Sequence, residues 1–300
     1  MKRKNMAAWA AAVVLLAVLM VIVLRPQSQG IFYRVSGGRN SMTILGSIHV
    51  GSREMYPFGK NIREALEQAD VLVFECDTQS EEAMRLTAEM MTLPQGSTLS
   101  ALLSETCTEK LEHASAKLGY DNAALQTFKP WAVVSMLSVA DTSQDMKAQK
   151  ALGVESVVRK SAQGKPEIWL ETTREQLEML DGMSMELQSY LLESACDEVL
   201  AGTIGETSSW PKWWSKGETE AFAQNYRDEM HAEADPILAA EYHTVLLTQR
   251  NRRMAERLSQ MLESDESHAY FVTIGLMHLV LQEDSVLTEL EKLGYTIEQI

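Results

Sequence analysis

Two short motifs of the same form stand near opposite ends of the chain, and each carries a histidine three residues after a glycine. The first is Thr43-Ile-Leu-Gly46-Ser-Ile-His49-Val50, and the second is Val272-Thr-Ile-Gly275-Leu-Met-His278-Leu279. An imidazole can transfer protons near neutral pH or bind a metal ion. A single Gly-x-x-His motif would more often be structural, but two copies in the same context indicate one shared site.

The context of both motifs predicts where the histidines lie. Each motif begins as a short β-branched and apolar run, typical of a buried strand that ends at its glycine. Glycine allows a sharp turn or the close approach of a ligand. We expect His49 and His278 on loops just past the carboxyl ends of their strands, the edge at which α/β sheets bind ligands. The two imidazoles meet there if the strands are neighbours.

An acidic residue is predicted at the same edge. A helix is predicted over Phe58–Ala69 after the first motif, and the apolar run Val71–Phe74 then leads into Glu75-Cys76-Asp77. This order is strand, helix, strand. Because such crossovers are right-handed, Glu75 should lie on the same edge as His49.

The remaining elements predict an α/β (α+β) fold. A hairpin of Ile31–Val35 and Met42–Leu45 opens the domain, and its last strands are Ala269–Ile274 and Tyr295–Glu298. The middle is mainly helical, apart from a short strand at Glu167–Glu171. The expected helices are Glu81–Met91, Glu105–Leu118, Pro130–Ala140, Gly153–Ala162, Thr173–Leu180, Ser184–Ala201, Glu218–Arg227, Pro236–Leu262 and Asp284–Leu293. We therefore expect a mixed sheet built from N- and C-terminal strands, with a large helical insert.

Length and composition indicate a chain with a sizeable core and a strongly acidic charge. The chain has 300 residues, 45% of them hydrophobic, which is ample material for a core. It carries 27 basic and 42 acidic residues and a net charge of −15. Binding to a phosphate backbone requires clustered positive charge, so nucleic acid is not an expected partner.

The N-terminus predicts a membrane anchor. The basic flank Lys2-Arg3-Lys4 precedes Ala7–Leu24, an uncharged run whose length as a helix matches the hydrocarbon thickness of a bilayer. Basic flanks stay cytoplasmic, so the chain should cross the cell membrane once and place its C-terminal domain outside the cytoplasm. A cleaved signal peptide is the alternative, but no Ala-x-Ala-like site follows. The expected layout is an anchor over 1–25, a tether over 26–30 and one domain over 31–300.

Several other features have ordinary structural interpretations. The three cysteines (Cys76, Cys107 and Cys196) allow one disulfide whose pairing the sequence leaves open, and Cys76 is typical of a small core residue. The cluster of Trp210, Trp213 and Trp214 predicts a packing unit at a helix end, with substrate contact or a membrane-facing patch as alternatives. The other histidines (His113, His231, His243 and His268) are predicted on the surface. Standard zinc-protease, serine-hydrolase and nucleotide-binding signatures are missing from the sequence.

Taken in order, blocks along residues 31–300 resemble the TraB/GumN family, which is related to the Tiki metalloproteases and more distantly to erythromycin-esterase-like proteins. The opening block is Gly46-Ser-Ile-His49-Val-Gly51, followed by Tyr56-Pro57 and Val73-Phe-Glu75-Cys-Asp77. The middle blocks are Lys129-Pro-Trp131, Gly153-Val-Glu155, Gly164-Lys-Pro166, Leu170-Glu-Thr172 and Gln176. The final blocks are Arg250-Asn251 and Phe271-Val-Thr-Ile-Gly275-Leu-Met-His278-Leu279. Glu155 stands where the family usually has aspartate.

The resemblance implies a metal-dependent hydrolase that cleaves peptide bonds in a peptide or protein substrate. His49 and His278 would be metal ligands, and Glu75 a ligand or general base. Two neutral imidazoles and one carboxylate can hold a divalent ion such as Mn, Co or Zn and leave a position open for water. Arg250 is a further catalytic candidate that could bind a carboxylate or stabilise an oxyanion. For Arg250 and Glu171, an internal salt bridge is an equally good interpretation.

Two other functions remain open. One is a metal-independent hydrolase of the esterase-like kind, in which His49 is the general base and Glu75 tunes its pKa. The other is a non-catalytic module that sequesters a secreted peptide near the membrane, by analogy with the family's pheromone-shutdown members. Fold analogy alone does not choose among the three.

Overall fold

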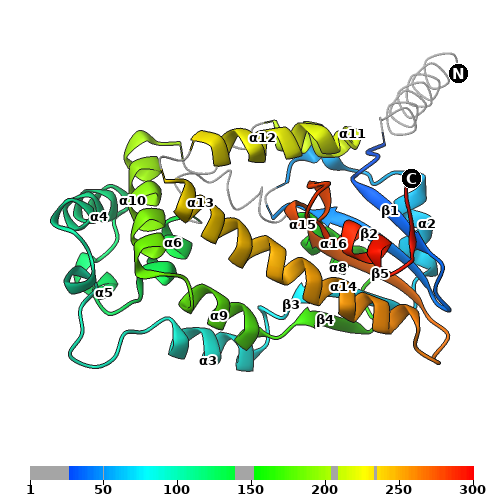
Figure 1. The fold of residues 1–300 in the computed structure, drawn as a ribbon, viewed down its shortest axis with the longest axis horizontal. Helices are drawn as coiled ribbons and strands as arrows, with labels where there is room; N and C mark the ends of the chain where they lie inside the picture. Colours follow the sequence, from blue (N-terminus) through cyan, green and yellow to red (C-terminus); the bar gives the residue numbers. More distant parts are fainter. Residues whose placement is uncertain (1–26, 50, 139–151, 204–208, 233–234) are drawn as a thin grey trace, which may run out of the picture.

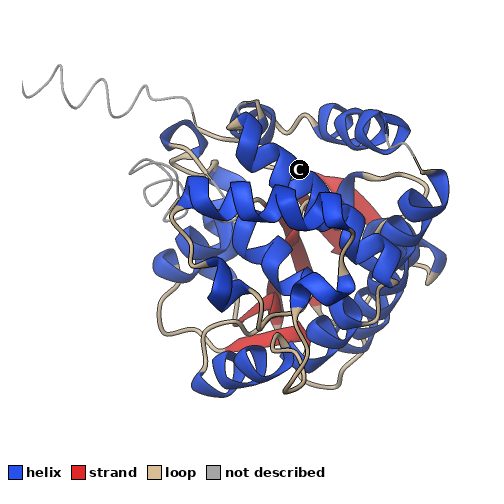
Figure 2. Cartoon of the chain, turned by 90° about the vertical axis from the view of Figure 1, so that its left-hand side faces the viewer, coloured by secondary structure: helices blue, strands red, loops and turns tan. Residues whose placement is uncertain are grey.

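The fold is organised around a six-stranded mixed sheet with the strand order β4-β3-β5-β2-β1-β6. The computed structural model describes residues 27–49, 51–138, 152–203, 209–232 and 235–300. Helices surround the strands, and α4, α5 and α10 lie at the end of the molecule away from β1 and β2 (Figures 1 and 2). The strands are β1 (Phe32–Ser36), β2 (Ser41–Ser47), β3 (Val71–Cys76), β4 (Glu167–Glu171), β5 (Ala269–Gly275) and β6 (Thr296–Gln299).

Helices make up most of the chain between β3 and β5, so the predicted helical insert and mixed sheet are confirmed. The α-helices are α2 (Lys60–Gln68), α3 (Glu81–Met90), α4 (Glu105–Leu118), α5 (Asn122–Leu125), α6 (Pro130–Ser138), α8 (Val154–Ser161), α9 (Thr173–Asp181), α10 (Met185–Ala201), α11 (Trp210–Lys216), α12 (Thr219–Ala232), α13 (Pro236–His243), α14 (Gln249–Leu262), α15 (Met277–Val280) and α16 (Val286–Lys292). Short turns are η1 (Arg53–Met55), η2 (Leu99–Leu102) and the π-helical η3 (Thr244–Thr248).

The sheet topology satisfies the condition on which a shared histidine site depends. Strands β4, β3, β5 and β2 run parallel, and β1 pairs antiparallel with both β2 and β6. The two motif strands are direct neighbours, with Gly46 opposite Ile274 and Ser47 opposite Gly275. The carboxyl ends of the four parallel strands therefore form one edge.

Three details differ from the sequence-based predictions. His278 lies in the helical turn α15 instead of a loop, because the chain begins to coil directly after β5. The predicted helix Pro236–Leu262 is interrupted by the π-helical turn η3 between α13 and α14. The apolar run Ala7–Leu24 lies outside the described residues, and among those that are described no helix is long and apolar enough to cross a bilayer.

The tryptophan cluster has two roles. Trp214 is completely buried in the main core, and its indole N–H donates to the carbonyl oxygen of Gly46 at 2.7 Å. The predicted packing role is thus confirmed for this residue. Trp210 is half-buried, and its indole N–H donates to Oδ1 of Asn225 at 3.0 Å. Helix α11 therefore packs one tryptophan against the first motif and presents another toward the neighbouring cavity.

All three cysteines are buried free thiols, so the disulfide that the sequence allowed is not formed. Cys107 and Cys196 belong to a second apolar core between α4, α6 and α10. Cys76 is the last residue of β3 and behaves as a small core residue, in line with the sequence-based interpretation.

The junction of β4 and α9 is held by a carboxylate whose charge should make stability depend on pH. Thr172 and Glu175 form a capping box, and Nη2 of Arg257 donates to Oε1 of Glu175 at 2.5 Å. Hydrogen bonds from Arg257 and then Thr172 lower the pKa of Glu175 from 4.5 to about 2. Because the folded-state pKa is the lower one, this contribution is present above the unfolded-state pKa and is lost as pH falls.

We therefore expect Glu175→Gln to have a flatter acid-stability profile than the wild type. The difference should develop as pH falls from about 4.5 to about 2, and it should be modest because both partners are about one-third exposed. Urea-unfolding midpoints measured across this range test the prediction. Parallel profiles for the two proteins would contradict it.

Candidate functional site

The predicted site residues lie together at the carboxyl edge of the parallel strands. His49 follows β2, Glu75 is the penultimate residue of β3, and Glu171 ends β4. His278 follows β5, which lies between β2 and β3. Arg250 reaches the same edge from α14. The topology thus gathers five side chains from separate parts of the chain.

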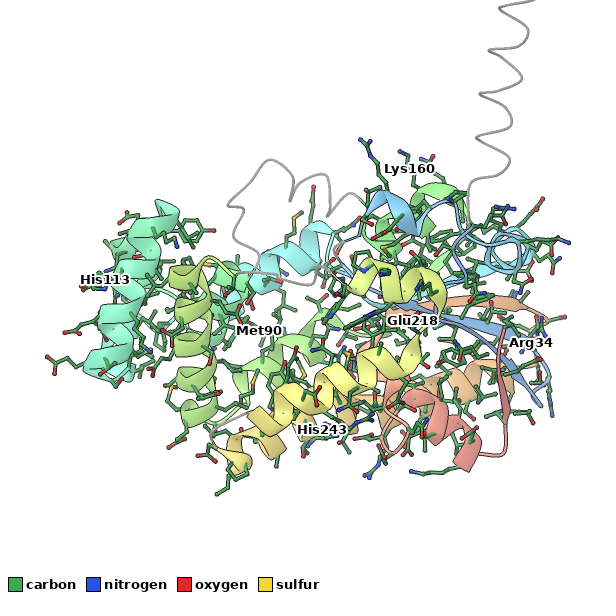
Figure 3. All side chains as sticks on the ribbon, turned by 90° about the horizontal axis from the view of Figure 1, so that it is seen from above. Arg34, Met90, His113, Lys160, Glu218 and His243 are labelled. Carbon is green, nitrogen blue, oxygen red and sulfur yellow. The ribbon has the colours of Figure 1, made fainter. Side chains whose placement is uncertain are left out.

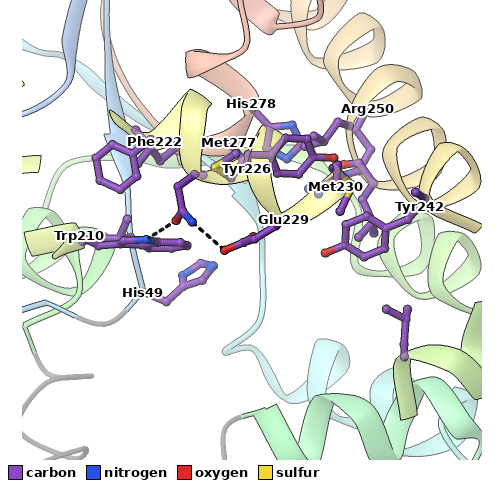
Figure 4. Close-up of a pocket in the computed structure, with 18 of the residues that line it drawn as sticks. His49, Trp210, Phe222, Tyr226, Glu229, Met230, Tyr242, Arg250, Met277 and His278 are labelled. Atoms are coloured by element: carbon purple, nitrogen blue, oxygen red, sulfur yellow. Dashed lines mark hydrogen bonds between the residues drawn. The ribbon is translucent and has the colours of Figure 1, made fainter. Parts of the chain in front are cut away.

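Four of these residues, all except Glu171, line a cavity of about 710 Å³. Its walls come mainly from α10, α12, α13 and η3, and they are largely apolar and aromatic. Figure 4 shows Tyr226, Tyr242 and Met230 along the wall, with His278 and Arg250 grouped together and His49 apart from them in that view. Side chains that line the cavity include His49, Glu75, Tyr226, Glu229, Arg250 and His278.

His278 is held in the interior, with 4% of its surface exposed. Its Nδ1 lies 2.7 Å from Oδ1 of Asn251. Burial lowers the pKa of His278 to about 4, which keeps the imidazole neutral at physiological pH. Nε2 is the ring nitrogen that remains for other chemistry.

Glu75 is a half-buried carboxylate, with 20% of its side chain exposed, and it has donors at both oxygens. Oε2 accepts from Nη2 of Arg250 at 2.8 Å, and Oε1 accepts from the backbone N–H of Gly275. Burial alone would raise the pKa of Glu75, but His278, Arg250 and the Gly275 N–H together hold it at about 2. The carboxylate is therefore ionised throughout the physiological range.

The two motif glycines allow other side chains to lie close to the backbone, and neither forms a sharp turn. Positive φ angles occur at other glycines of the described chain, but not at Gly46 or Gly275. A Cβ built on Gly275 would lie 2.7 Å from Oε1 of Glu75, and one built on Gly46 would lie 2.8 Å from a methyl group of Leu276. A Cβ at position 275 would thus displace the Glu75 carboxylate from the backbone N–H that binds it.

Arg250 joins two carboxylates. Its Nε lies 3.0 and 3.1 Å from the two carboxylate oxygens of Glu171, and its Nη2 donates to Glu171 at 2.6 Å as well as to Glu75. The side chain of Glu171 is 1% exposed. The internal salt bridge expected as one interpretation of Arg250 and Glu171 is therefore present, and it holds Glu75 in place.

His49 is arranged differently from His278. Its side chain is 84% exposed, and its Nδ1 lies 3.2 Å from Oε1 of Glu155. Ser47 donates to the same oxygen at 2.6 Å. The hydrogen bond with Glu155 raises the pKa of His49 to about 9, an effect that solvent screening reduces at so exposed a side chain. As in His278, Nδ1 is hydrogen-bonded to a side-chain oxygen, and Nε2 is the ring nitrogen left to bind a metal ion or exchange a proton.

Sequence reasoning missed several residues of this site. Glu155 was visible in the Gly153-Val-Glu155 block, and Asn251 beside Arg250, but neither was predicted as a site residue. His243, predicted on the surface, is instead half-buried between Tyr226 and Asp284. His113 is exposed on α4, and His268 is a half-buried residue paired with Glu266 (Figure 3). The side chain of His231 lies outside the description.

The donor types suit a divalent ion, but their present arrangement is not a closed metal site. Among the described residues, no three His, Cys, Asp or Glu side chains are placed to share one ion. Glu75 is engaged by Arg250 and Gly275, and His49 is engaged by Glu155. Each histidine has its Nδ1 bonded to an oxygen, as metal-ligating histidines usually do. The donor types of His49, Glu75 and His278 are thus those of a metal site, but their positions in the described structure do not bring all three to one ion.

Comparison with known proteins identifies the family of the chain. The model of the TraB/PrgY/gumN family matches residues 31–299. The chain belongs to this family. The resemblance seen in the sequence is thereby confirmed, and both Gly-x-x-His motifs, Glu75 and Arg250 lie inside the matched region.

The individual relatives of this family member share only about a quarter of its residues over the aligned regions. The uncharacterized protein YbaP of Escherichia coli strain K12 is 26% identical over 144 residues, which cover 48% of this chain and 53% of YbaP. YbaP of Shigella flexneri is 27% identical over 145 residues, with the same coverage. An uncharacterized protein of Treponema pallidum is 24% identical over 212 residues, 65% of this chain and 64% of that protein. The chain thus spans about half the length of the YbaP proteins, and no solved structure matches it.

Proposed function

We propose that this family member is a metal-dependent hydrolase of peptide bonds, with His49, Glu75 and His278 holding one divalent cation. The observation that carries the proposal is the pairing of the two motifs. Neighbouring parallel strands deliver two imidazoles to one cavity, and each has its Nδ1 bonded to a side-chain oxygen. In both rings, Nε2 is therefore the nitrogen that can bind a metal ion or exchange a proton. Mn, Co and Zn are the candidate metals.

When bound, a divalent ion would lower the pKa of a water molecule and polarise the scissile carbonyl. The protein's own residues supply the rest. Glu75 is ionised and rigidly held, so it can act as ligand or as general base. Arg250 maintains that position from the buried side. The apolar wall of the cavity can enclose a peptide side chain and exclude water from the reacting bond.

The location proposed for this activity follows from the N-terminal sequence. The uncharged run Ala7–Leu24 behind a basic flank favours a single-pass anchor in the cell membrane. The catalytic domain would then act on peptides or proteins outside the cytoplasm. Ser28, four residues beyond Leu24, already forms a β-bridge with Phe58 of the domain. The domain would therefore sit close to the membrane.

Metal content is the first test of this function. The full-length chain should be purified without chelators or a histidine tag, and its metal measured by elemental analysis after incubation with Mn, Co or Zn. We expect about one ion per chain in the wild type and a loss of it in His49→Ala, because His49 supplies one of few ligands. His113→Ala is the matched control, since His113 is exposed on α4 at one end of the molecule (Figure 3). Equal metal content in all three proteins would contradict the proposal.

One observation favours a second candidate, a metal-independent hydrolase. His49 lines the cavity and pairs with Glu155, and such an imidazole–carboxylate pair can orient a histidine as a general base at a pH above its raised pKa. Cleavage that persists in EDTA and is lost in His49→Ala would favour this alternative. Cleavage that stops in EDTA and returns with added metal would favour the metal-dependent enzyme.

A further inference from the structure

A chain of hydrogen bonds connects two residues that line the cavity, Tyr226 and His278. It starts at Tyr226, whose hydroxyl lies 2.9 Å from Nδ1 of His243. Nε2 of His243 lies 3.1 Å from Oδ2 of Asp284, and Nδ2 of Asn251 lies 3.1 Å from Oδ1 of the same carboxylate. Oδ1 of Asn251 then meets Nδ1 of His278 at 2.7 Å. Asp284 is the shared centre of this chain.

The direction of each hydrogen bond toward His278 follows from Asp284. Nδ2 of Asn251 faces the backbone carbonyl and the carboxylate of Asp284, and both of these groups only accept. The amide must therefore present its NH₂ to Asp284 and its oxygen to His278. Because the amide oxygen accepts, Nδ1 of His278 must carry the proton. In the neutral ring, Nε2 then holds the lone pair.

The other arm of the chain follows by the same logic. Oδ2 of Asp284 faces the hydroxyl of Thr248 and Nε2 of His243. A carboxylate accepts, so His243 donates from Nε2, and its Nδ1 in the neutral ring accepts from the hydroxyl of Tyr226. The hydroxyl of Tyr226 is thereby pointed at His243.

The π-helical turn η3 explains how one carboxylate reaches both arms. His243 ends α13 and Asn251 lies in α14, on either side of η3. The interval between them is not a whole number of α-helical turns, so in a regular helix they would face different directions. Hydrogen bonding from i to i+5 places more residues in each turn. The wider turns of η3 bring both side chains to the side that faces Asp284.

We propose that Asp284, acting through Asn251, is a positioning residue that sets the tautomer of His278. It places the proton on Nδ1 and the lone pair on Nε2, and through His243 it orients Tyr226 on the cavity wall. All members of the chain are at least half-buried, and Asn251 is completely buried. Tautomer control stands on this geometry alone. Its use in catalysis rests on the proposed hydrolase function, in which a lone pair on Nε2 is required to bind a cation or take up a proton.

The tautomer of His278 can be measured without an activity assay. The full-length, metal-free protein would be labelled with ¹⁵N-histidine, and the ring nitrogens observed by long-range ¹H–¹⁵N correlation at neutral pH, with the His278 signals assigned by their loss in His278→Gln. We expect Nδ1 of His278 to be protonated and Nε2 unprotonated in the wild type. In Asn251→Leu the Nε2-protonated form should appear, and in Asp284→Asn it should appear to a smaller extent, because the backbone carbonyl at position 284 still accepts from Asn251. Tyr226→Phe should leave the His278 tautomer unchanged, because Asn251 and Asp284 remain.

Two results would overturn the proposal. One is a wild-type His278 protonated on Nε2, which needs no variant and is therefore independent of whether the variants fold. The other is an unchanged Nδ1–H form in Asn251→Leu or Asp284→Asn with a native circular-dichroism spectrum, which removes the altered residue from this role. Where cleavage is measurable, Asn251→Leu should lower kcat by about 10- to 100-fold with a smaller change in KM. Absent cleavage in the wild type would count against the hydrolase function and leave the tautomer result standing.

Discussion

Replacement of Arg250 by leucine is expected to lower the free energy of unfolding by about 3–5 kcal/mol, the usual cost of removing one partner from a buried charge network. Glu171 and Glu75 would both lose their guanidinium partner, and Glu171 is almost fully enclosed. Arg253 lies 3.6 Å from Glu171, but its side chain is half-exposed and it does not reach Glu75 by any observed contact. Urea unfolding of the two proteins at neutral pH measures the difference.

A second arginine provides the matched control for this experiment. Arg34 pairs with Glu298 at 3.1 Å on the exposed face of the sheet. Arg34→Leu removes the same kind of ion pair where water can replace it, so its cost should be about 0–1 kcal/mol. Substituting Glu171 by leucine in the Arg250→Leu background should recover part of the loss, because the orphaned charge disappears. Equal costs for the two arginines would show that the buried network does not stabilise the fold.

Replacement of His278 by asparagine is expected to lower peptide cleavage by about 10²- to 10⁴-fold, the range typical for loss of a group that handles a proton in the transition state. Asparagine places an amide nitrogen near the position of Nδ1, so the hydrogen bond to Asn251 can be kept. Nothing replaces Nε2. The variant thus separates the chemistry of His278 from its structural role.

The measurement is kcat/KM with a fluorogenic peptide mixture, together with metal content and the unfolding midpoint. His278→Leu should lose the same activity and more stability, because it also leaves Oδ1 of Asn251 buried without a donor. His113→Asn, on the exposed side of α4, should behave like the wild type. Cleavage by His278→Asn at the wild-type rate would remove Nε2 from the proposed mechanism.

The locations of the two motifs show which parts of the fold could be predicted from local sequence pattern. Apolar β-branched runs that end at Gly46 and Gly275 predicted β2 and β5 correctly. The strand–helix–strand order correctly placed Glu75 at the carboxyl edge of the sheet. These features are local or follow from the parallel direction that a strand–helix–strand crossover gives its two strands. Sequence pattern did not require β2 and β5 to be neighbours. That depends on how strands from opposite ends of the chain insert beside one another.

Residues brought together by helices were beyond the reach of sequence pattern. Glu155 reaches His49 because α8 packs with its first turn beside the end of β2, and Asp284 reaches both His243 and Asn251 because of the π-helical turn η3. An isolated aspartate or glutamate on a helix carries no local signal for such contacts. In the sequence His243 is indistinguishable from His113, yet one joins a buried network and the other is exposed.

By itself, the amino-acid sequence determined the family, the class of fold and the edge of the sheet at which His49, Glu75 and His278 lie, since these depend on strand periodicity and short motifs. Only the tertiary structure decided the state of each group. It buried His278 as a neutral ring, kept Glu75 ionised between Arg250 and Gly275, and left His49 exposed beside Glu155. The physical reason is that protonation and hydrogen bonding are set by desolvation and by nearby charges, and these come from residues distant in sequence.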